Sequence, residues 1–106
     1  MKLTIHEIAK VVQAKNDVTI YPDQALANIE FDSRLIKSGD IFLPLKGARD
    51  GHEFIDVAFD NGAVITFSEK NSAHPHILVD NTELAFQTLA SYYLEKTGVD
   101  VIAITG

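Results

Sequence analysis

The chain has 106 residues, a formal net charge of −6 and no cysteine. This length is sufficient for one domain with a single core. The negative charge disfavours a nucleic-acid binder or an anionic-membrane binder, because those proteins need a basic face. No stretch approaches the ~20 apolar residues of a membrane span, and residues 1–10 lack the apolar core of a signal peptide. The lack of cysteine excludes disulfides and thiolate metal sites and fits a reducing cytoplasm, so we expect a cytoplasmic protein.

The first half of the chain predicts a helix followed by short strands. Thr4 is a suitable N-cap, and Glu7 three residues later completes a capping box. Apolar residues then recur at helical spacing: Ile5, Ile8, Ala9 and Val12. Strands are expected at 18–21, 29–31 and 41–45. Pro22 ends the first of them, a tight turn at 38–40 leads into the third, and Pro44 indicates a sheet edge or a strand end.

The second half predicts two helices and three strands. The first helix has an apolar face and is closed by Asn61-Gly62; the face comprises Phe54, Ile55, Ala58 and Phe59. Strands are expected at 64–67, 77–79 and 99–104. Asn81 or Thr82 can cap a long helix that ends at Gly98, with an apolar stripe of Leu84, Ala85, Leu89, Tyr92, Tyr93 and Leu94.

The alternation of strands and helices places the chain in the α/β class. Short strand segments are also suited to antiparallel edges. We therefore predict a small mixed β-sheet flanked by helices.

The stretch from Asp32 to Phe54 surrounds an apolar strand with polar, charged and glycine residues. Ser33 and Arg34 precede the strand, and the residues that follow it are Lys46, Gly47, Arg49, Asp50, Gly51 and His52. A strand, a polar loop and a helix start place backbone N–H groups and cations where a phosphate can sit. The stretch therefore predicts a site for an anionic, hydrogen-bonding ligand.

The end of the sequence is a second unusual feature. Thr105-Gly106 follows an apolar strand directly, as in the opening of a phosphate-binding loop whose complete form is GxxxxGK[ST]. The Lys and Ser/Thr of that form are absent, and an ordinary turn is the alternative explanation for Thr-Gly on its own.

Several motifs occur in order along the chain with ordinary spacing. They are DSR at 32–34, GDIF at 39–42, LKG at 45–47, DGHEF at 50–54, Ala58, Gly62-Ala63, Ala85, Leu89, Ala90 and IAITG at 102–106. With them the chain resembles the N-terminal domain of the Mur ligases, ATP-dependent amide-bond-forming enzymes of peptidoglycan synthesis. The combination PLKGARDGHEF looks most like the MurF type, which adds D-alanyl-D-alanine to the UDP-muramoyl tripeptide. The MurE type, which adds the third amino acid, shares DSR and DGH and is the nearest alternative.

The resemblance implies that residues 1–100 form a domain that binds the UDP end of UDP-N-acetylmuramoyl-tripeptide. Residues 101–106 would be the first strand and truncated phosphate loop of a central ATPase domain, with Thr105 and Gly106 at the ATP. The parent enzyme would use ATP and Mg²⁺ to convert the tripeptide carboxylate into an acyl phosphate, which the amine of D-alanyl-D-alanine attacks. The 106-residue chain itself would be inactive, monomeric and without a cofactor. A stand-alone, non-enzymatic ligand-binding module is the alternative.

The resemblance implies five UDP-binding residues, Ser33, Arg34, Lys46, Gly47 and His52. Ser33 can donate to and accept from a uracil edge or a phosphate, and Arg34 can form a two-pronged contact with diphosphate oxygens. Lys46 offers a charge, Gly47 a backbone N–H and His52 a donor. The structural alternatives are a turn hydroxyl beside a surface Arg34 paired with Asp32, and an ordinary solvated loop at Lys46-Gly47.

Other polar residues are expected to shape the loops: Asp32, Gly39, Asp50 and Gly51. Asp50 suits a helix cap, and Gly51 suits unusual backbone angles. No catalytic residue is assigned to this chain, because the chemistry of the family takes place on the central domain.

His74 and His76 stand two residues apart, a spacing that on a strand can indicate a metal site. The intervening Pro75 and the lack of a third ligand nearby favour a surface loop, so no metal site is assigned. Asn81-Thr82 can approach a uridine from the end of a strand, but helix capping explains both residues.

Overall fold

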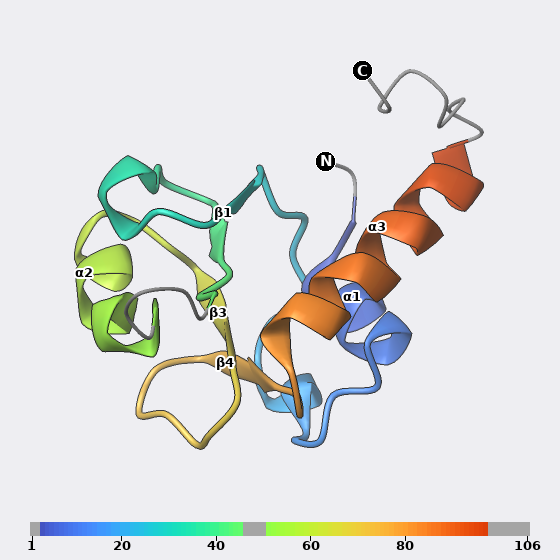
Figure 1. The fold of residues 1–106 in the computed structure, drawn as a ribbon, viewed down its shortest axis with the longest axis horizontal. Helices are drawn as coiled ribbons and strands as arrows, with labels where there is room; N and C mark the ends of the chain where they lie inside the picture. Colours follow the sequence, from blue (N-terminus) through green and yellow to red (C-terminus); the bar gives the residue numbers. More distant parts are fainter. Residues whose placement is uncertain (1–2, 46–50, 98–106) are drawn as a thin grey trace.

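The computed structural model describes residues 3–45 and 51–97, which form a parallel sheet between helices (Figure 1). The helices are α1 (Ile5–Val11), α2 (Ile55–Asp60) and α3 (Thr82–Thr97), and the strands are β1 (Ile29–Glu30), β2 (Ile41–Phe42), β3 (Ile65–Ser68) and β4 (His76–Leu78). Short 3₁₀ turns lie at η1 (Val18–Ile20), η2 (Ser33–Leu35) and η3 (Gly51–Phe54). This arrangement confirms the predicted α/β class.

The strands of the described residues lie in the order β1-β2-β3-β4, and each neighbouring pair is parallel. Ile41 of β2 stands beside Ile29 of β1 and Ile65 of β3. Within the described ranges, antiparallel pairing is limited to an isolated bridge between Thr4 and Ala25, so the sheet there is parallel rather than mixed. No helix in these ranges is long and apolar enough to cross a membrane.

Successive side chains of a strand point to opposite faces of the sheet, and the helices cover these faces unequally. Helices α1 and α3 lie on one side and α2 lies on the other (Figure 1). Ile41, Ile65 and Phe67 are fully buried in the cluster that also contains residues of α1 and α3. Phe42 belongs instead to a smaller cluster with Ile55 and other residues around α2.

The N-cap expected at Thr4 and the turn expected before β2 are confirmed. The Thr4 side chain accepts a hydrogen bond from the Glu7 N–H at 3.3 Å. Gly39 has φ +93° in the turn before β2, and the Asp40 carboxylate accepts the Lys37 N–H at 2.9 Å. Pro44 is fully buried beyond the end of β2, which agrees with the strand-end alternative.

Residues 18–21 do not form the expected strand. The Asp17 side chain accepts hydrogen bonds from the Thr19 N–H, at 3.0 Å, and from its hydroxyl, so the backbone closes into the turn η1. A side chain that satisfies the local backbone in this way competes with pairing in a sheet. Ile20 is consequently exposed.

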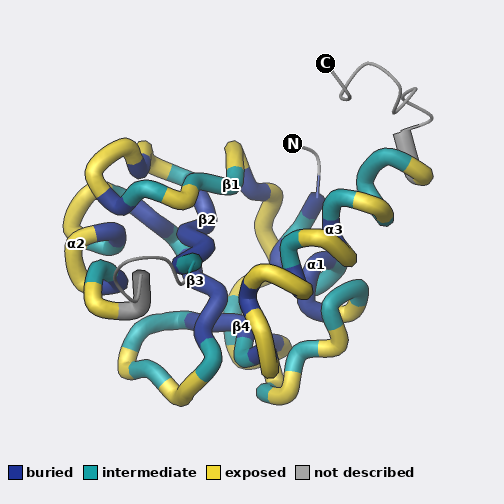
Figure 2. The backbone as a smooth tube through the Cα atoms, in the orientation of Figure 1, coloured by how far each residue is buried: buried dark blue, intermediate teal, exposed yellow. Residues whose placement is uncertain are grey.

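The long helix α3 begins as predicted. The Asn81 side chain accepts the Leu84 N–H at 2.9 Å, while the N–H of the buried Thr82 donates to Glu69 at 2.9 Å. The apolar stripe is narrower than expected, because Leu84 points to solvent and is 61% exposed. Figure 2 shows the same contrast along α3, where exposed stretches alternate with less exposed ones.

Residues 98–106 lie outside the described part of the chain, so the predicted strand 99–104 and the helix end at Gly98 remain predictions.

Candidate functional site

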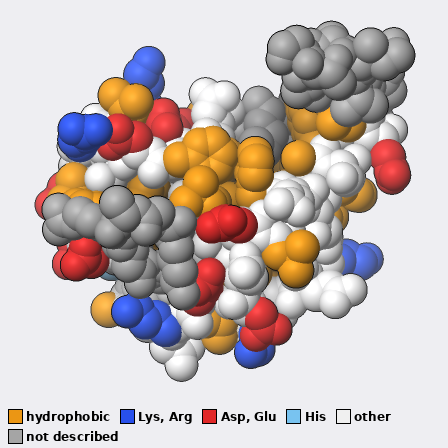
Figure 3. All heavy atoms as spheres, in the orientation of Figure 1, with side chains coloured by type: hydrophobic (Ala, Val, Ile, Leu, Met, Phe, Trp, Pro, Cys, Tyr) orange, Lys and Arg blue, Asp and Glu red, His pale blue; other side chains and the backbone are white. Residues whose placement is uncertain are grey.

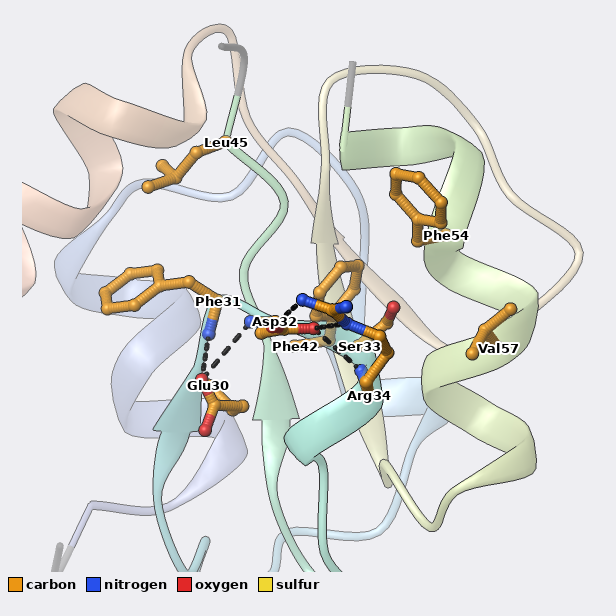
Figure 4. A pocket seen from close by; sticks show the side chains of 9 residues that line it. All are labelled: Glu30, Phe31, Asp32, Ser33, Arg34, Phe42, Leu45, Phe54 and Val57. Carbon is orange, nitrogen blue, oxygen red and sulfur yellow. Dashed lines mark hydrogen bonds and ion pairs between the residues drawn. The ribbon is translucent and has the colours of Figure 1, made fainter. Parts of the chain in front are cut away.

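A pocket of about 630 Å³ opens where β1 and β2 end (Figure 4). Its walls come from β1 and the residues after it, from the end of β2, and from the α2 region; they are Glu30, Phe31, Asp32, Ser33, Arg34, Phe42, Leu45, Phe54 and Val57. The carboxyl ends of parallel strands are the usual place for a ligand in an open α/β sheet. The pocket therefore forms the candidate site.

Asp32 and Arg34 form a hydrogen-bonded ion pair at this pocket (Figure 4). The Arg34 Nε donates to Asp32 Oδ1 at 3.0 Å, and Nη2 donates to Oδ2 at 2.8 Å. The Arg34 N–H also donates to Oδ1 at 2.9 Å, which makes Asp32 the N-cap of η2. The surface pairing considered from the sequence is thus present, and the side chain of Arg34 is 83% exposed.

These bonds set the protonation of the pair. The Arg34 side chain, and then its backbone N–H, lower the pKa of Asp32 to about 2. The same hydrogen bonds and the charge of Asp32 raise the pKa of Arg34. Both groups are therefore ionised at neutral pH, and an anionic ligand at Arg34 meets a charge that Asp32 already balances in part.

Ser33 and Glu30 support the loop between β1 and η2. Ser33 is buried, and its carbonyl accepts a hydrogen bond from Asn61 Nδ2 at 2.9 Å. The Glu30 carboxylate accepts the N–H groups of Phe31, at 2.8 Å, and Asp32, at 3.2 Å. The loop that carries the candidate residues is thereby tied to α2 on one side and to β1 on the other.

Apolar side chains make up much of the pocket wall, and the sequence did not single them out as part of the site. Phe31, Leu45, Phe54 and Val57 surround the opening (Figure 4). Phe31 is 41% exposed and Val57 40%, which is high for large apolar residues. Figure 3 shows hydrophobic side chains gathered near the middle of the molecular face in that view, with acidic side chains beside them.

The structure brings together some of the predicted residues and leaves others undescribed. Ser33, Arg34 and Asp32 line the pocket, whereas Gly39 lies in the turn that precedes β2. Gly51 is the first residue of η3, and the side chain of His52 is outside the described part. Lys46, Gly47, Asp50, Thr105 and Gly106 also lie outside the described residues.

The two histidines have separate environments. His74 lies in the loop before β4, where its ring stacks on Phe59 with centroids 4.3 Å apart and Nε2 lies 2.6 Å from Asp56 Oδ1. His76 is buried in β4, so the surface-loop prediction is wrong for this residue, because strand pairing turns it inward. In the described ranges no group of three or more His, Cys, Asp or Glu comes together to hold a metal ion.

Comparison with known proteins gives consistent results. The family described as "Mur ligase family, catalytic domain" matches residues 25–103. The UDP-N-acetylmuramoyl-tripeptide–D-alanyl-D-alanine ligase of Bacillus subtilis is 34% identical over 112 residues, covering 100% of this chain and 24% of the relative. The UDP-N-acetylmuramoyl-L-alanyl-D-glutamate–2,6-diaminopimelate ligase of Geobacter sulfurreducens is 34% identical, covering 98% of this chain and 22% of the relative.

Solved structures agree with the sequence matches. MurF from Acinetobacter baumannii superposes with a TM-score of 0.81 at 28% identity, covering 91% of this chain and 22% of that chain. MurF ligase from Thermotoga maritima, in complex with ADP, gives a TM-score of 0.57 at 30% identity over 65% of this chain and 17% of that chain. The chain spans about a quarter of the length of the curated relatives it matches. The family match and the identity along the whole chain show that it belongs to the Mur ligase family.

Proposed function

We propose that this chain is the N-terminal domain of a MurF-type ligase and binds the UDP end of UDP-N-acetylmuramoyl-tripeptide. The observation that carries the proposal is the match along the whole chain to a ligase named for that substrate. The pocket at the ends of β1 and β2, with Arg34 held at its wall, supports a role in ligand binding. The parent enzyme would join D-alanyl-D-alanine to the tripeptide in the cytoplasm, and this chain would act as a monomer.

The described residues suggest how the UDP is held. A guanidinium has five N–H donors, and the side-chain bonds to Asp32 use Nε and one N–H of Nη2. The remaining donors are available to diphosphate oxygens without reorientation of the side chain, which lowers the entropic cost of binding. The Ser33 hydroxyl can add a hydrogen bond to the ligand. Lys46, Gly47 and His52 complete the proposed set.

We assign the use of ATP and Mg²⁺ to the parent enzyme, an assignment supported for the nucleotide by the T. maritima structure in complex with ADP. ATP supplies the phosphoryl group that activates the tripeptide carboxylate. The chain contains Thr105-Gly106 but not the complete GxxxxGK[ST] motif, so its residues do not fit ATP and Mg²⁺ on their own. We therefore expect the 106-residue chain to have neither ATPase nor ligase activity.

A MurE-type parent enzyme is the second candidate, favoured by the similarity to the diaminopimelate ligase of G. sulfurreducens. Both candidates share the UDP-muramoyl end of the substrate, so they predict the same site on this chain. Assay of the full-length enzyme with D-alanyl-D-alanine and with diaminopimelate, each with the matching UDP-muramoyl peptide, distinguishes them.

The test of the UDP site is an NMR titration of the chain with UDP. We expect chemical-shift changes around Ser33 and Arg34, and binding about tenfold weaker in Arg34→Ala, because charge-assisted hydrogen bonds at an exposed site are lost. Lys10→Ala, which removes an exposed cation from α1, is the matched control and should bind like the unaltered chain. No UDP-dependent shift at millimolar ligand would contradict the proposal.

A further inference from the structure

We propose that Phe86 of α3 is a positioning residue for nucleobase recognition: it holds the Phe31 ring as the pocket wall against which the uracil of UDP packs. The inference rests on the proposed UDP function and adds a residue outside the pocket to it.

The first observation is the geometry of the two rings. The Phe31 and Phe86 centroids are 5.0 Å apart with an interplanar angle of 87°, an edge-to-face arrangement that aromatic pairs favour. Phe31 lines the pocket and is 41% exposed. A large side chain this exposed has several accessible rotamers, and contact with a second ring selects among them.

The Phe31 backbone is held as well as its ring. Its N–H donates to the Glu30 carboxylate at 2.8 Å, immediately after the last paired residue of β1. The Cα position is therefore set by the strand and the carboxylate. The side-chain orientation is set by Phe86, which comes from a distant part of the chain.

Phe86 is itself well anchored. It is partly buried and packs against the larger hydrophobic cluster. One turn earlier, the Thr82 N–H and hydroxyl both donate to Glu69, and Asn81 caps the helix. Because α3 is fixed at its start and packed along its length, Phe86 keeps its place. The Phe31 ring that packs on it is therefore held as well.

The chemistry of the wall favours a flat, weakly polar ring. In the described part of the pocket, the charged lining residues are Glu30, Asp32 and Arg34, and Asp32 already pairs with Arg34. The other described lining residues, apart from Ser33, are apolar or aromatic. Aromatic side chains stack on nucleobases whichever the base is. Phe31 therefore increases the affinity of the pocket for uracil, and polar groups provide the selectivity between bases.

The experiment compares UDP, uridine and inorganic diphosphate by NMR titration of the chain. In Phe86→Ala we expect UDP and uridine to bind about three- to tenfold more weakly, while any diphosphate binding is unchanged. Phe31→Ala should lose at least as much affinity for uridine. Leu84→Ala changes an exposed residue of the same helix and should bind all ligands as the unaltered chain does.

Two further variants keep the test decisive. Phe86→Tyr retains the ring and should restore uridine binding, whereas Phe86→Leu retains apolar bulk without the ring and should not. If circular dichroism shows that Phe86→Ala does not fold, Phe86→Leu takes its place in the comparison.

Unchanged uridine affinity in the folded variant, or an equal loss of affinity for UDP and diphosphate, would overturn the positioning role while leaving the UDP site intact. An unaltered chain that does not bind UDP would instead end the proposed function, and this inference with it.

Discussion

The two faces of the sheet are covered in different ways. On the α1/α3 face the strands contribute large apolar side chains such as Ile65 and Phe67, both fully buried, to the larger cluster. On the α2 face the same strand β3 presents Thr66 and Ser68, which are also fully buried. Thr66 Oγ1 donates there to the Phe42 carbonyl at 3.1 Å.

The two faces therefore contribute differently to the stability of the fold and to the pocket. Burial of apolar surface is the main favourable contribution to folding, and in the described residues the larger cluster lies on the α1/α3 face. The α2 face has the smaller cluster and hydrogen-bonded polar groups, and through Phe42, Phe54 and Val57 it supplies part of the wall of the pocket at the strand ends. Helix α2 is held there partly by polar contacts, including Asn61 to the Ser33 carbonyl and His74 to Asp56.

The largest expected effect compares one phenylalanine from each face. Phe67→Ala should lower the free energy of unfolding by about 3–5 kcal/mol, because it leaves a cavity in the larger cluster. Phe42→Ala should cost at least about 1 kcal/mol less, since Phe42 borders the pocket and its neighbours can relax into the space. Urea unfolding of both variants measures the difference. Equal losses would remove the distinction between the faces.

A smaller effect concerns the backbone contact between α2 and the turn before β2. Gly62 has φ +117°, and a Cβ there would lie 2.9 Å from the Ser38 Cα. Gly39 has φ +93°, but its Cβ would meet the Ala27 Cβ at an ordinary 3.6 Å. We expect Gly39→Ala to lower the free energy of unfolding by about 1–2 kcal/mol, because of backbone strain. Gly62→Ala should lower it by at least about 1 kcal/mol more, because of the added clash.

Thermal and urea unfolding of the two glycine variants test whether the close backbone contact at Gly62 fixes the position of α2 on the sheet. A Gly62→Ala protein no less stable than Gly39→Ala would mean that α2 shifts freely on its face of the sheet. The polar contacts of α2 would then contribute little to its position.

The smallest effect is the pH response of the pocket. The pKa of Asp32 is about 2 in the folded chain, below the ~3.9 of an unperturbed aspartate. Its contribution to stability is therefore complete above about pH 4 and is lost as the pH falls through about 2. An NMR titration of the Asp32 carboxyl should show this pKa, and Arg34→Ala should raise it towards, but not fully to, the ordinary value, because the backbone N–H bond remains.

An unshifted Asp32 pKa in the unaltered chain would show that the pair with Arg34 is not formed in solution. The pocket would then lack the fixed guanidinium on which the proposed diphosphate contact depends.

Local chemistry explains which elements were predictable. The cap at Thr4, the glycine turn before β2 and the Asn81 cap of α3 each depend on a few neighbouring residues, so their patterns predict them directly. For residues 18–21 the β-branched composition predicts a strand, whereas Asp17 closes the backbone locally. The sequence did not reveal which of these two tendencies prevails.

Only the polar residues of the candidate site were predictable from the sequence. Ser33 and Arg34 belong to a short motif whose chemistry is visible in the sequence, and both line the pocket. The apolar wall could not be found in this way, because Phe31 and Val57 look like ordinary core residues until their exposure is known. Contacts between distant segments, such as Phe31 with Phe86, have no local signal.

The sequence by itself determined the α/β class, most helix and turn boundaries and the family to which the chain belongs, because these follow from local pattern and ordered motifs. The tertiary structure decided which segments form the walls of the pocket, and it turned His76 inward and Leu84 outward. These outcomes depend on strand pairing, helix packing and side-chain orientation in three dimensions. The stretch from Asp32 to Phe54 predicts a ligand site, and the fold places Ser33 and Arg34 of that stretch in the wall of a pocket.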